Sequence, residues 1–259
     1  MSNGRAVTWD GFFNARDLGG LPTRDGRRTR HGAFIRSADL RFVTEAGWKA
    51  AWLAGVRSVI DLRNPDEIRP QRDGPGPTAL AGSAQFVAPM ADSRAPQQLQ
   101  RIELPLDDIG DTAFWREMND KGLNGLPHYY GPFLARKRER CAAVVTAMAD
   151  AAPGGVLFHC GAGRDRTGLV AMLLLGLAGV EPSAIVSDYQ LTAQGLPPLL
   201  AALGLPDSST LSGDAPALST AVEAELRAVL REYDMESYLR GAGVAVDDIS
   251  TIRARLLGP

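Results

Sequence analysis

The chain has 259 residues, of which 45% are hydrophobic, so it is long enough to bury a substantial core and to fold unaided. Its 28 Lys and Arg residues against 30 Asp and Glu residues leave a formal charge of -2, which argues against a general binder of nucleic acids or anionic membranes. Any recognition of an anion must therefore be local.

The two cysteines and the N-terminal residues indicate the cellular compartment in which the protein works. Two cysteines, Cys141 and Cys160, cannot form a disulfide framework, and an unpaired reactive thiol is typical of a reducing environment. Residues 1–11 lack the apolar core of a signal peptide, and the longest apolar run, 169–180, is too short to span a bilayer. We therefore expect a cytoplasmic protein without a transmembrane segment.

The first part of the chain predicts short strands, one helix and one buried strand. Between residues 5 and 39, short apolar pieces alternate with turns rich in Gly and Arg, which favours short strands or hairpins. Thr44 is a suitable N-cap for a helix that ends near Gly55. Residues 56–62 then predict a parallel strand whose polar end opens onto a functional edge.

Residues from about 70 to 127 predict no regular element. The segment is rich in Pro, Gly, Ala and Gln, and the Gly-Pro-Gly-Pro sequence at 74–77 is its clearest breaker. Loops of this length inside a compact domain are either functional covers or surface insertions, and both interpretations stay open here. We expect an irregular insertion, or a lid near the active site.

The rest of the chain predicts one strand and several helices. A helix from about 133 to 151 carries apolar residues at helical spacing, with Cys141 on the face expected in the core. Residues 156–158 predict a buried strand, followed by a glycine-rich loop and an apolar helix that begins near Arg166. The region from about 183 to 259 predicts helices at about 183 to 194, 216 to 232, 235 to 240 and 247 to 257. Together these elements predict an α/β sheet with a helical C-terminal half.

The glycine-rich loop carries the chemistry. Cys160 and Arg166 enclose five residues, and the helix that follows adds its positive N-terminal end. A short glycine-rich turn lets consecutive backbone N–H groups point inward and form a cradle for an anion. The predicted phosphate-binding residues are Gly161, Ala162, Gly163, Arg164, Asp165 and Arg166.

The side chains of this loop suit phosphoryl transfer through a thiolate. The expected reaction is in-line attack by Cys160 on phosphorus, followed by hydrolysis of the phosphocysteine to inorganic phosphate, without a metal ion or cofactor. Arg166 offers a planar fork for two phosphoryl oxygens. Thr167 can donate a hydrogen bond to the departing sulfur, and His159 is expected to hold the loop by hydrogen bonding rather than to titrate.

A general acid must protonate the leaving oxygen, and the sequence offers several carboxylates for this role. Asp165 is favoured because it lies within the loop, although an acidic residue there also interacts with the helix dipole. Asp107 and Asp108 are the alternatives, carried toward the site by the long loop. Distance and protonation state decide such roles, so spacing alone leaves the alternatives open.

The loop resembles that of protein tyrosine phosphatases, and more closely that of the bacterial tyrosine/serine protein phosphatase family, whose loop ends in Asp-Arg-Thr-Gly. Two residues depart from the family pattern, because Ala15 replaces a Phe and Arg164 replaces a Lys. The Trp-Pro-Asp loop that carries the acid in many tyrosine phosphatases is absent from the sequence. Further elements similar to those of the family are residues 14–20, 34–37, 60–63 and 238–240.

The resemblance implies a phosphatase fold, with a central sheet flanked by helices, that spans 1–259 as one domain. It implies Cys160 as the nucleophile, Arg166 as the phosphate ligand and Asp165 as the acid. We expect a hydrolase that dephosphorylates phosphotyrosine and, with dual specificity, phosphoserine and phosphothreonine. Phosphoinositides are the alternative substrates, and a phosphate-binding module without turnover is the remote alternative.

Overall fold

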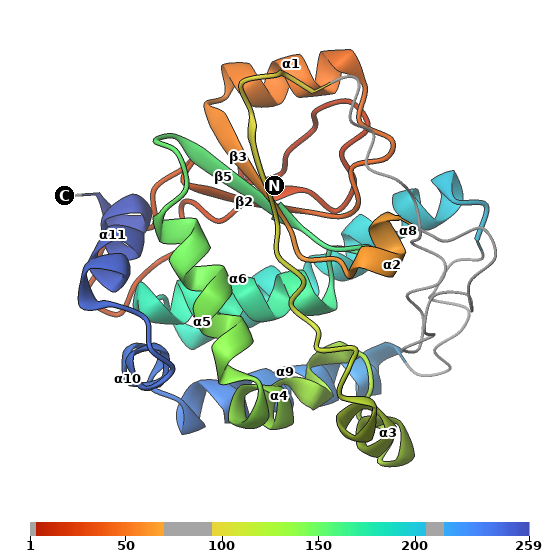
Figure 1. Cartoon of the computed structure of the whole chain (residues 1–259), viewed down its shortest axis with the longest axis vertical. Helices are drawn as coiled ribbons and strands as arrows, with labels where there is room; N and C mark the ends of the chain where they lie inside the picture. Colours follow the sequence, from red (N-terminus) through yellow and green to blue (C-terminus); the bar gives the residue numbers. More distant parts are fainter. Residues whose placement is uncertain (1–3, 70–94, 206–214, 259) are drawn as a thin grey trace.

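The computed structural model describes residues 4–69, 95–205 and 215–258 and has an α/β architecture built on a five-stranded sheet (Figure 1). The strands lie in the order β1-β2-β5-β3-β4. β5 pairs in parallel with β2 and β3, and β3 pairs in parallel with β4, whereas β1 runs antiparallel to β2. The predicted α/β class is confirmed. The strand bounds are β1 Arg16–Asp17, β2 Phe34–Ser37, β3 Val56–Asp61, β4 Gln100–Glu103 and β5 Gly155–His159.

The two faces of the sheet are covered by different helices, with α1 on one side and α5 and α6 on the other (Figure 1). Successive side chains of a strand point to opposite faces. Leu157 of β5 accordingly packs in one apolar cluster with Trp48 of α1, while Phe158 belongs to the larger cluster that contains α5 and α6. Burial on both faces explains why β5 is a continuous apolar run.

The helical segments account for most of the remaining described chain. Thr44 caps α1 as predicted, because its side chain accepts a hydrogen bond from the Gly47 N–H. The bounds are α1 Glu45–Leu53, α2 Pro65–Ile68, α3 Thr112–Asp120, the 3₁₀ helix η3 Leu126–Tyr129, α4 Tyr130–Arg136, α5 Arg138–Ala149, α6 Asp165–Leu177, α7 Pro182–Gln190, α8 Thr192–Ala202, α9 Ala215–Glu232, α10 Met235–Gly241 and α11 Val246–Leu257. Among the described residues, no helix is long and apolar enough to cross a membrane.

The carboxyl ends of the three inner strands meet at one edge of the sheet. His159, the last residue of β5, lies opposite Ser37 of β2 and opposite Asp61 of β3. The glycine-rich loop leaves β5 at this edge and leads into α6, which is apolar on all sides and is buried beneath the sheet. The edge thus collects the ends of strands that are far apart in the sequence.

The prediction of an irregular segment from about 70 to 127 is wrong for its later part. That part contains β4, α3 and η3. β4 escaped prediction because it is an edge strand of mostly polar residues that are exposed or only partly buried, so it carries little apolar pattern. Residues 70–94, the other part of the predicted lid, lie outside the described residues.

The predicted helix from 133 to 151 is instead two helices, α4 and α5, which meet at Lys137. Lys137 leaves the helical conformation, with φ -127 and ψ 34, and its buried ammonium group donates to Asp108 (3.0 Å) and Asp111 (2.6 Å). Two carboxylates thus hold the residue at which the helix breaks. Cys141 is buried in the core, as predicted.

The C-terminal half is helical, as predicted, with one difference. The helix expected from about 183 to 194 ends at Gln190, and a further helix, α8, follows it. α8 contains Pro197 and Pro198 in its interior. Proline lacks the N–H that a helix interior uses, so two consecutive prolines are an unfavourable sequence for a helix at this place.

Candidate active site

The loop between β5 and α6 holds the predicted nucleophile. Cys160 directly follows β5, and its side chain is almost completely buried. The hydroxyl of Thr167 donates a hydrogen bond to the Cys160 Sγ at 3.2 Å. Because α6 begins at Asp165, the sulfur lies beside the positive end of a 13-residue helix.

The loop carbonyl groups are hydrogen-bonded from outside the loop. The bonds are Asp39 N–H to Gly161 O (2.8 Å), Asn14 Nδ2 to Ala162 O (3.0 Å) and Gly163 O (3.1 Å), and Arg36 Nη2 to Gly163 O (2.9 Å). In a planar trans peptide, the C=O and the next N–H point in opposite directions. The N–H groups of residues 162 to 164 therefore point toward the inside of the loop, which is the arrangement that binds an anion.

Gly163 is required by the shape of this loop. Its φ of 68 lies in the left-handed region, which glycine adopts without strain. A Cβ at this position would lie 2.5 Å from the backbone oxygen of Ser37, at the end of β2. The loop can therefore pass this close to β2 only because residue 163 has no side chain.

Arg166, the predicted phosphate ligand, is oriented by two buried carboxylates. Its Nη1 and Nη2 donate to the two oxygens of Glu67 at 2.5 and 2.7 Å, and its Nη1 lies 3.4 Å from Asp107. Burial lowers the pKa of Arg166, but the charges of Asp107 and Glu67 outweigh burial and raise it well above its ordinary value. Glu67 in turn accepts the Asn64 N–H at the start of α2 (2.8 Å), which fixes the pair to the end of β3.

Asp107 differs from the other acidic residues near the loop. It is buried, with 9% of its surface exposed, and burial raises its pKa to about 6. The nearby charge of Glu67 raises the pKa further, while Arg166 opposes both effects. A carboxyl group with this pKa carries a proton through much of the mildly acidic range.

Asp108 and Asp165 are engaged in ion pairs. Asp108 accepts from Lys137 (3.0 Å) and Arg140 (3.2 Å), so its carboxylate joins the loop after β4 to α5. The Asp165 carboxylate lies 3.1 and 3.2 Å from the Arg164 Nε, and it raises the pKa of Arg164. The Asp165 carbonyl accepts the Tyr130 hydroxyl at 2.6 Å.

His159 lies behind the loop rather than inside it. The ring is fully buried, with Nδ1 3.2 Å from the Cys160 carbonyl oxygen and Nε2 3.6 Å from the Asp61 carboxylate. Burial lowers the pKa of His159 more than the charge of Asp61 raises it, so the ring is neutral at pH 7. These contacts tie the end of β3 to the start of the loop.

A buried charge cluster, which sequence reasoning did not identify, supports the loop from behind. Asp188 of α7 accepts from Arg5 (2.7 Å), Arg16 (3.2 Å) and Arg36 (2.8 Å). Burial raises the pKa of Asp188, but the three guanidinium groups outweigh burial and hold it far below its ordinary value. Arg36 also donates a hydrogen bond to the Gly163 carbonyl, so the cluster is in direct contact with the loop.

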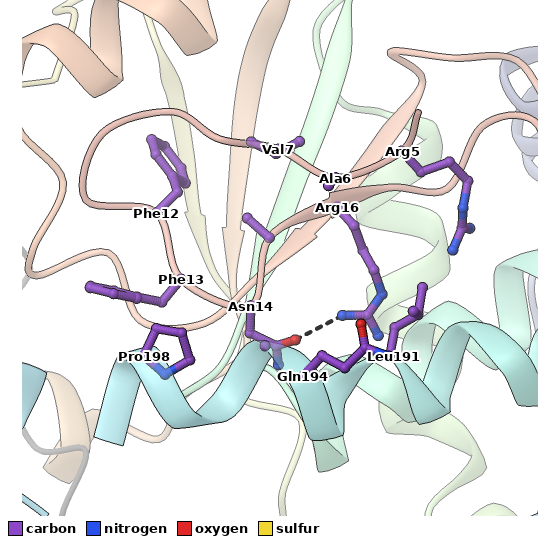
Figure 2. A pocket seen from close by; sticks show the side chains of 12 residues that line it. Arg5, Ala6, Val7, Phe12, Phe13, Asn14, Arg16, Leu191, Gln194 and Pro198 are labelled. Atoms are coloured by element: carbon purple, nitrogen blue, oxygen red, sulfur yellow. Dashed lines mark hydrogen bonds between the residues drawn. The ribbon is translucent and has the colours of Figure 1, made fainter. Parts of the chain in front are cut away.

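Two residues that contact the loop, and a third that contacts one of them, lie in elements whose similarity to a phosphatase family the sequence had indicated. Asn14 and Arg36 hold loop carbonyls, and Arg16 donates to the Asn14 Oδ1 at 2.8 Å (Figure 2). Glu67 and Asp188 carried no comparable signal, because their contacts with Arg166 and Arg36 span 99 and 152 residues.

The matching family profile and the similar proteins are all phosphatases by name. The sequence profile of a tyrosine phosphatase family matches residues 7–258. A candidate tyrosine-protein phosphatase of Cupriavidus necator is 33% identical over 192 residues, which cover 71% of this chain and 61% of the relative. A tyrosine-protein phosphatase of Nostoc commune is 35% identical over 164 residues, covering 63% of this chain and 49% of the relative. The triple specificity protein phosphatase PtpB of Mycobacterium tuberculosis is 28% identical over 294 residues, covering 96% and 98%.

The buried charge cluster generates a stability prediction. Replacing Asp188 by Asn removes the carboxylate shared by three buried guanidinium groups, and we expect the free energy of unfolding at pH 7 to fall by about 3 to 5 kcal/mol. Because the folded-state pKa of Asp188 lies below the unfolded value of about 3.9, its stabilisation is complete above that pH and is lost as the pH falls. Urea unfolding of both proteins at pH 7 and at about pH 3 measures the difference.

Asp25→Asn is the matched control, because Asp25 pairs with Arg27 in an exposed turn. We expect this control to leave the unfolding transition nearly unchanged. Equal stability of the wild type and Asp188→Asn at pH 7 would contradict the role assigned to the cluster.

Proposed function

The chain belongs to the tyrosine phosphatase family, and on that premise we propose that it is a cysteine-dependent hydrolase of phosphomonoesters, with phosphotyrosine in proteins as its main substrate. The observation that carries the proposal is the loop from Cys160 to Arg166. A buried thiol lies at its base, loop N–H groups point inward, and a guanidinium is held beside it by Glu67. These are the groups that a phosphocysteine mechanism needs.

In the proposed first step, the Cys160 thiolate attacks phosphorus in line, so that an S–P bond forms as the ester P–O bond breaks. The phosphoryl oxygens accept hydrogen bonds from loop N–H groups and from Arg166. Glu67 takes two of the five guanidinium N–H groups and leaves others for the phosphate. The guanidinium is thus aimed before substrate arrives, which avoids reorganisation during the reaction.

In the proposed second step, water attacks the phosphocysteine, the S–P bond breaks, and inorganic phosphate leaves. The sulfur then departs as a thiolate and takes back the electron pair of the bond. Thr167 stands ready to stabilise it, because its hydroxyl already donates to Sγ at 3.2 Å. No step of this sequence draws on His159, whose neutral ring faces Asp61.

We propose Asp107 as the general acid that protonates the leaving oxygen. Its raised pKa of about 6 and its position 3.4 Å from the Arg166 Nη1 support this role, because an acid must hold a proton beside the phosphate site. Asp165, which the sequence favours, is the second candidate; its carboxylate would first have to leave the Arg164 guanidinium. Asp108 would have to leave both Lys137 and Arg140.

The substrate class is proposed from the family and from the names of the relatives. Two relatives are named tyrosine-protein phosphatases, and PtpB is named a triple specificity phosphatase. The chain spans about three fifths and about half of the length of the first two. We therefore propose phosphotyrosine as the main substrate, and phosphoserine and phosphothreonine as further ones.

We further propose that residues 1–259 act as one catalytic domain in the reducing cytoplasm. The two cysteines are free, and burial raises the pKa of Cys141 to about 12, so Cys141 is inert as a nucleophile. An enzyme that depends on an unmodified thiol at Cys160 is suited to a compartment that keeps thiols reduced.

The acid assignment predicts a pH dependence. Protonated Asp107 is the active form, so kcat/KM on a phosphoserine peptide should decline as the pH rises through about 6. In Asp107→Asn this decline should disappear, and turnover of the peptide should fall by roughly 10²-fold to 10⁴-fold. An aryl phosphate with a good leaving group, such as p-nitrophenyl phosphate, should lose much less activity. Asp165→Asn serves as the comparison, and loss of the decline in that variant alone would move the role to Asp165.

The substrate proposal is tested by a turnover panel with matched phosphotyrosine, phosphoserine and phosphothreonine peptides and with phosphoinositide vesicles. We expect the highest kcat/KM on phosphotyrosine, weaker turnover of the other peptides, and no release of phosphate by Cys160→Ser. Fastest turnover of phosphoinositides would contradict the proposed substrate class. Binding of phosphate without turnover of any substrate would contradict the enzymatic proposal itself.

A further inference from the structure

Tyr129, the last residue of η3, is a buried tyrosine that takes no part in the two proposed reaction steps. Only 3% of its surface is exposed, and its ring belongs to the same apolar cluster as Cys160. η3 packs against α6, the helix that begins at the end of the phosphate loop. The tyrosine is therefore held beside the elements that carry the candidate active site.

Two neighbouring rings connect Tyr129 to the segments that carry the candidate acids. The centroid of the Trp115 ring lies 5.9 Å from that of Tyr129, and the Trp115 Nε1 donates to the Asp108 carbonyl at 2.9 Å. The Tyr130 ring lies 5.2 Å away, edge to face, and its hydroxyl donates to the Asp165 carbonyl at 2.6 Å. Tyr129 thus packs on rings that are anchored to the loop after β4 and to the start of α6.

The hydroxyl of Tyr129 is an available hydrogen-bond donor. Within residues 4–69, 95–205 and 215–258 it makes no hydrogen bond, and it is not one of the fully enclosed side-chain atoms there that lack a partner. The Tyr189 hydroxyl, by contrast, is enclosed and without a partner in the same part of the chain. The Tyr129 hydroxyl is therefore the end of a buried ring that reaches accessible space, where a ligand can meet it.

The charged groups around this hydroxyl are those of the phosphate site. Burial raises the pKa of Tyr129 well above its ordinary value, and the charges of Asp107 and Asp165 raise it further. Cys160 acts in the same direction and Arg166 in the opposite one, so the hydroxyl lies close enough to both groups to sense their charges. Because the hydroxyl stays protonated at neutral pH, it can donate a hydrogen bond to an anion there.

We propose that Tyr129 binds the phosphoryl group of the substrate, with its hydroxyl donating a hydrogen bond to a phosphoryl oxygen in the cradle. This role rests on the phosphate-binding function proposed for the loop. A phosphate that enters a buried site loses water, and its oxygens then need donors from the protein. Loop N–H groups and Arg166 supply some of them, but Glu67 already takes two N–H groups of Arg166. The tyrosine adds a donor without adding a charge.

Calorimetric titration of the full chain with inorganic phosphate tests the role of Tyr129. Tyr129→Phe keeps the ring and removes only the hydroxyl, so we expect the Kd of phosphate to rise by about tenfold to hundredfold, as for the loss of a hydrogen bond to a charged group. The urea midpoint of the ligand-free variant should not fall, because the hydroxyl has no partner within the described residues.

Tyr238→Phe is the matched control, because it also removes one tyrosine hydroxyl. That hydroxyl donates to the Leu134 carbonyl at 3.0 Å and not to the phosphate loop. We expect the control to lower the urea midpoint of the ligand-free protein and to leave the phosphate Kd unchanged. The same pattern in Tyr129→Phe, a lower midpoint with an unchanged Kd, would show that Tyr129 only packs and would overturn the proposal.

Failure of this proposal can be distinguished from failure of the proposed function. An equal phosphate Kd in the wild type and in Tyr129→Phe would overturn the role of Tyr129 and leave the phosphatase activity standing. A wild type that neither binds phosphate nor releases it from any substrate would contradict the proposed function, and the role of Tyr129 with it.

Discussion

The phosphate loop depends on hydrogen bonds that hold its carbonyl oxygens from behind. An anion cradle needs N–H groups that point inward, and a planar peptide allows this only if the carbonyls point outward and find donors there. Those donors come from Asn14, Arg36 and Asp39, which precede the loop by more than 100 residues, and the loop is therefore assembled only when the sheet forms. Asn14 adopts a left-handed φ of 46, a conformation that Asn tolerates better than most residues.

The charges around the loop are arranged in two groups with different tasks. On the side that would meet substrate, Glu67 aims Arg166, and Asp107 is buried beside them with a raised pKa. Behind the loop, three guanidinium groups outnumber Asp188 and leave net positive charge next to the carbonyl of Gly163. The excess positive charge behind the loop and the guanidinium of Arg166 favour negative charge inside the loop, where a thiolate and a phosphate would lie.

The sequence carried enough local information to predict the strand, loop and helix around Cys160, because the apolar strand, the glycines and the apolar helix are contiguous. The same reasoning failed where tertiary contacts override local pattern. β4 is an edge strand with polar residues, and Lys137, at the break between α4 and α5, is bound by the distant Asp108 and Asp111. Glu67 and Asp188 had no local signature, since each acts on an arginine about 100 residues or more away.

The central claim is that Cys160 attacks phosphorus and carries the phosphoryl group, and trapping that intermediate tests the claim most directly. The chain is mixed with an aryl phosphate, quenched in acid within the first turnovers, digested, and analysed by mass spectrometry for the position of the added phosphate. The account predicts a phosphorylated peptide that contains Cys160, and no phosphopeptide in Cys160→Ser. Turnover at full rate with phosphate on a different residue would contradict it.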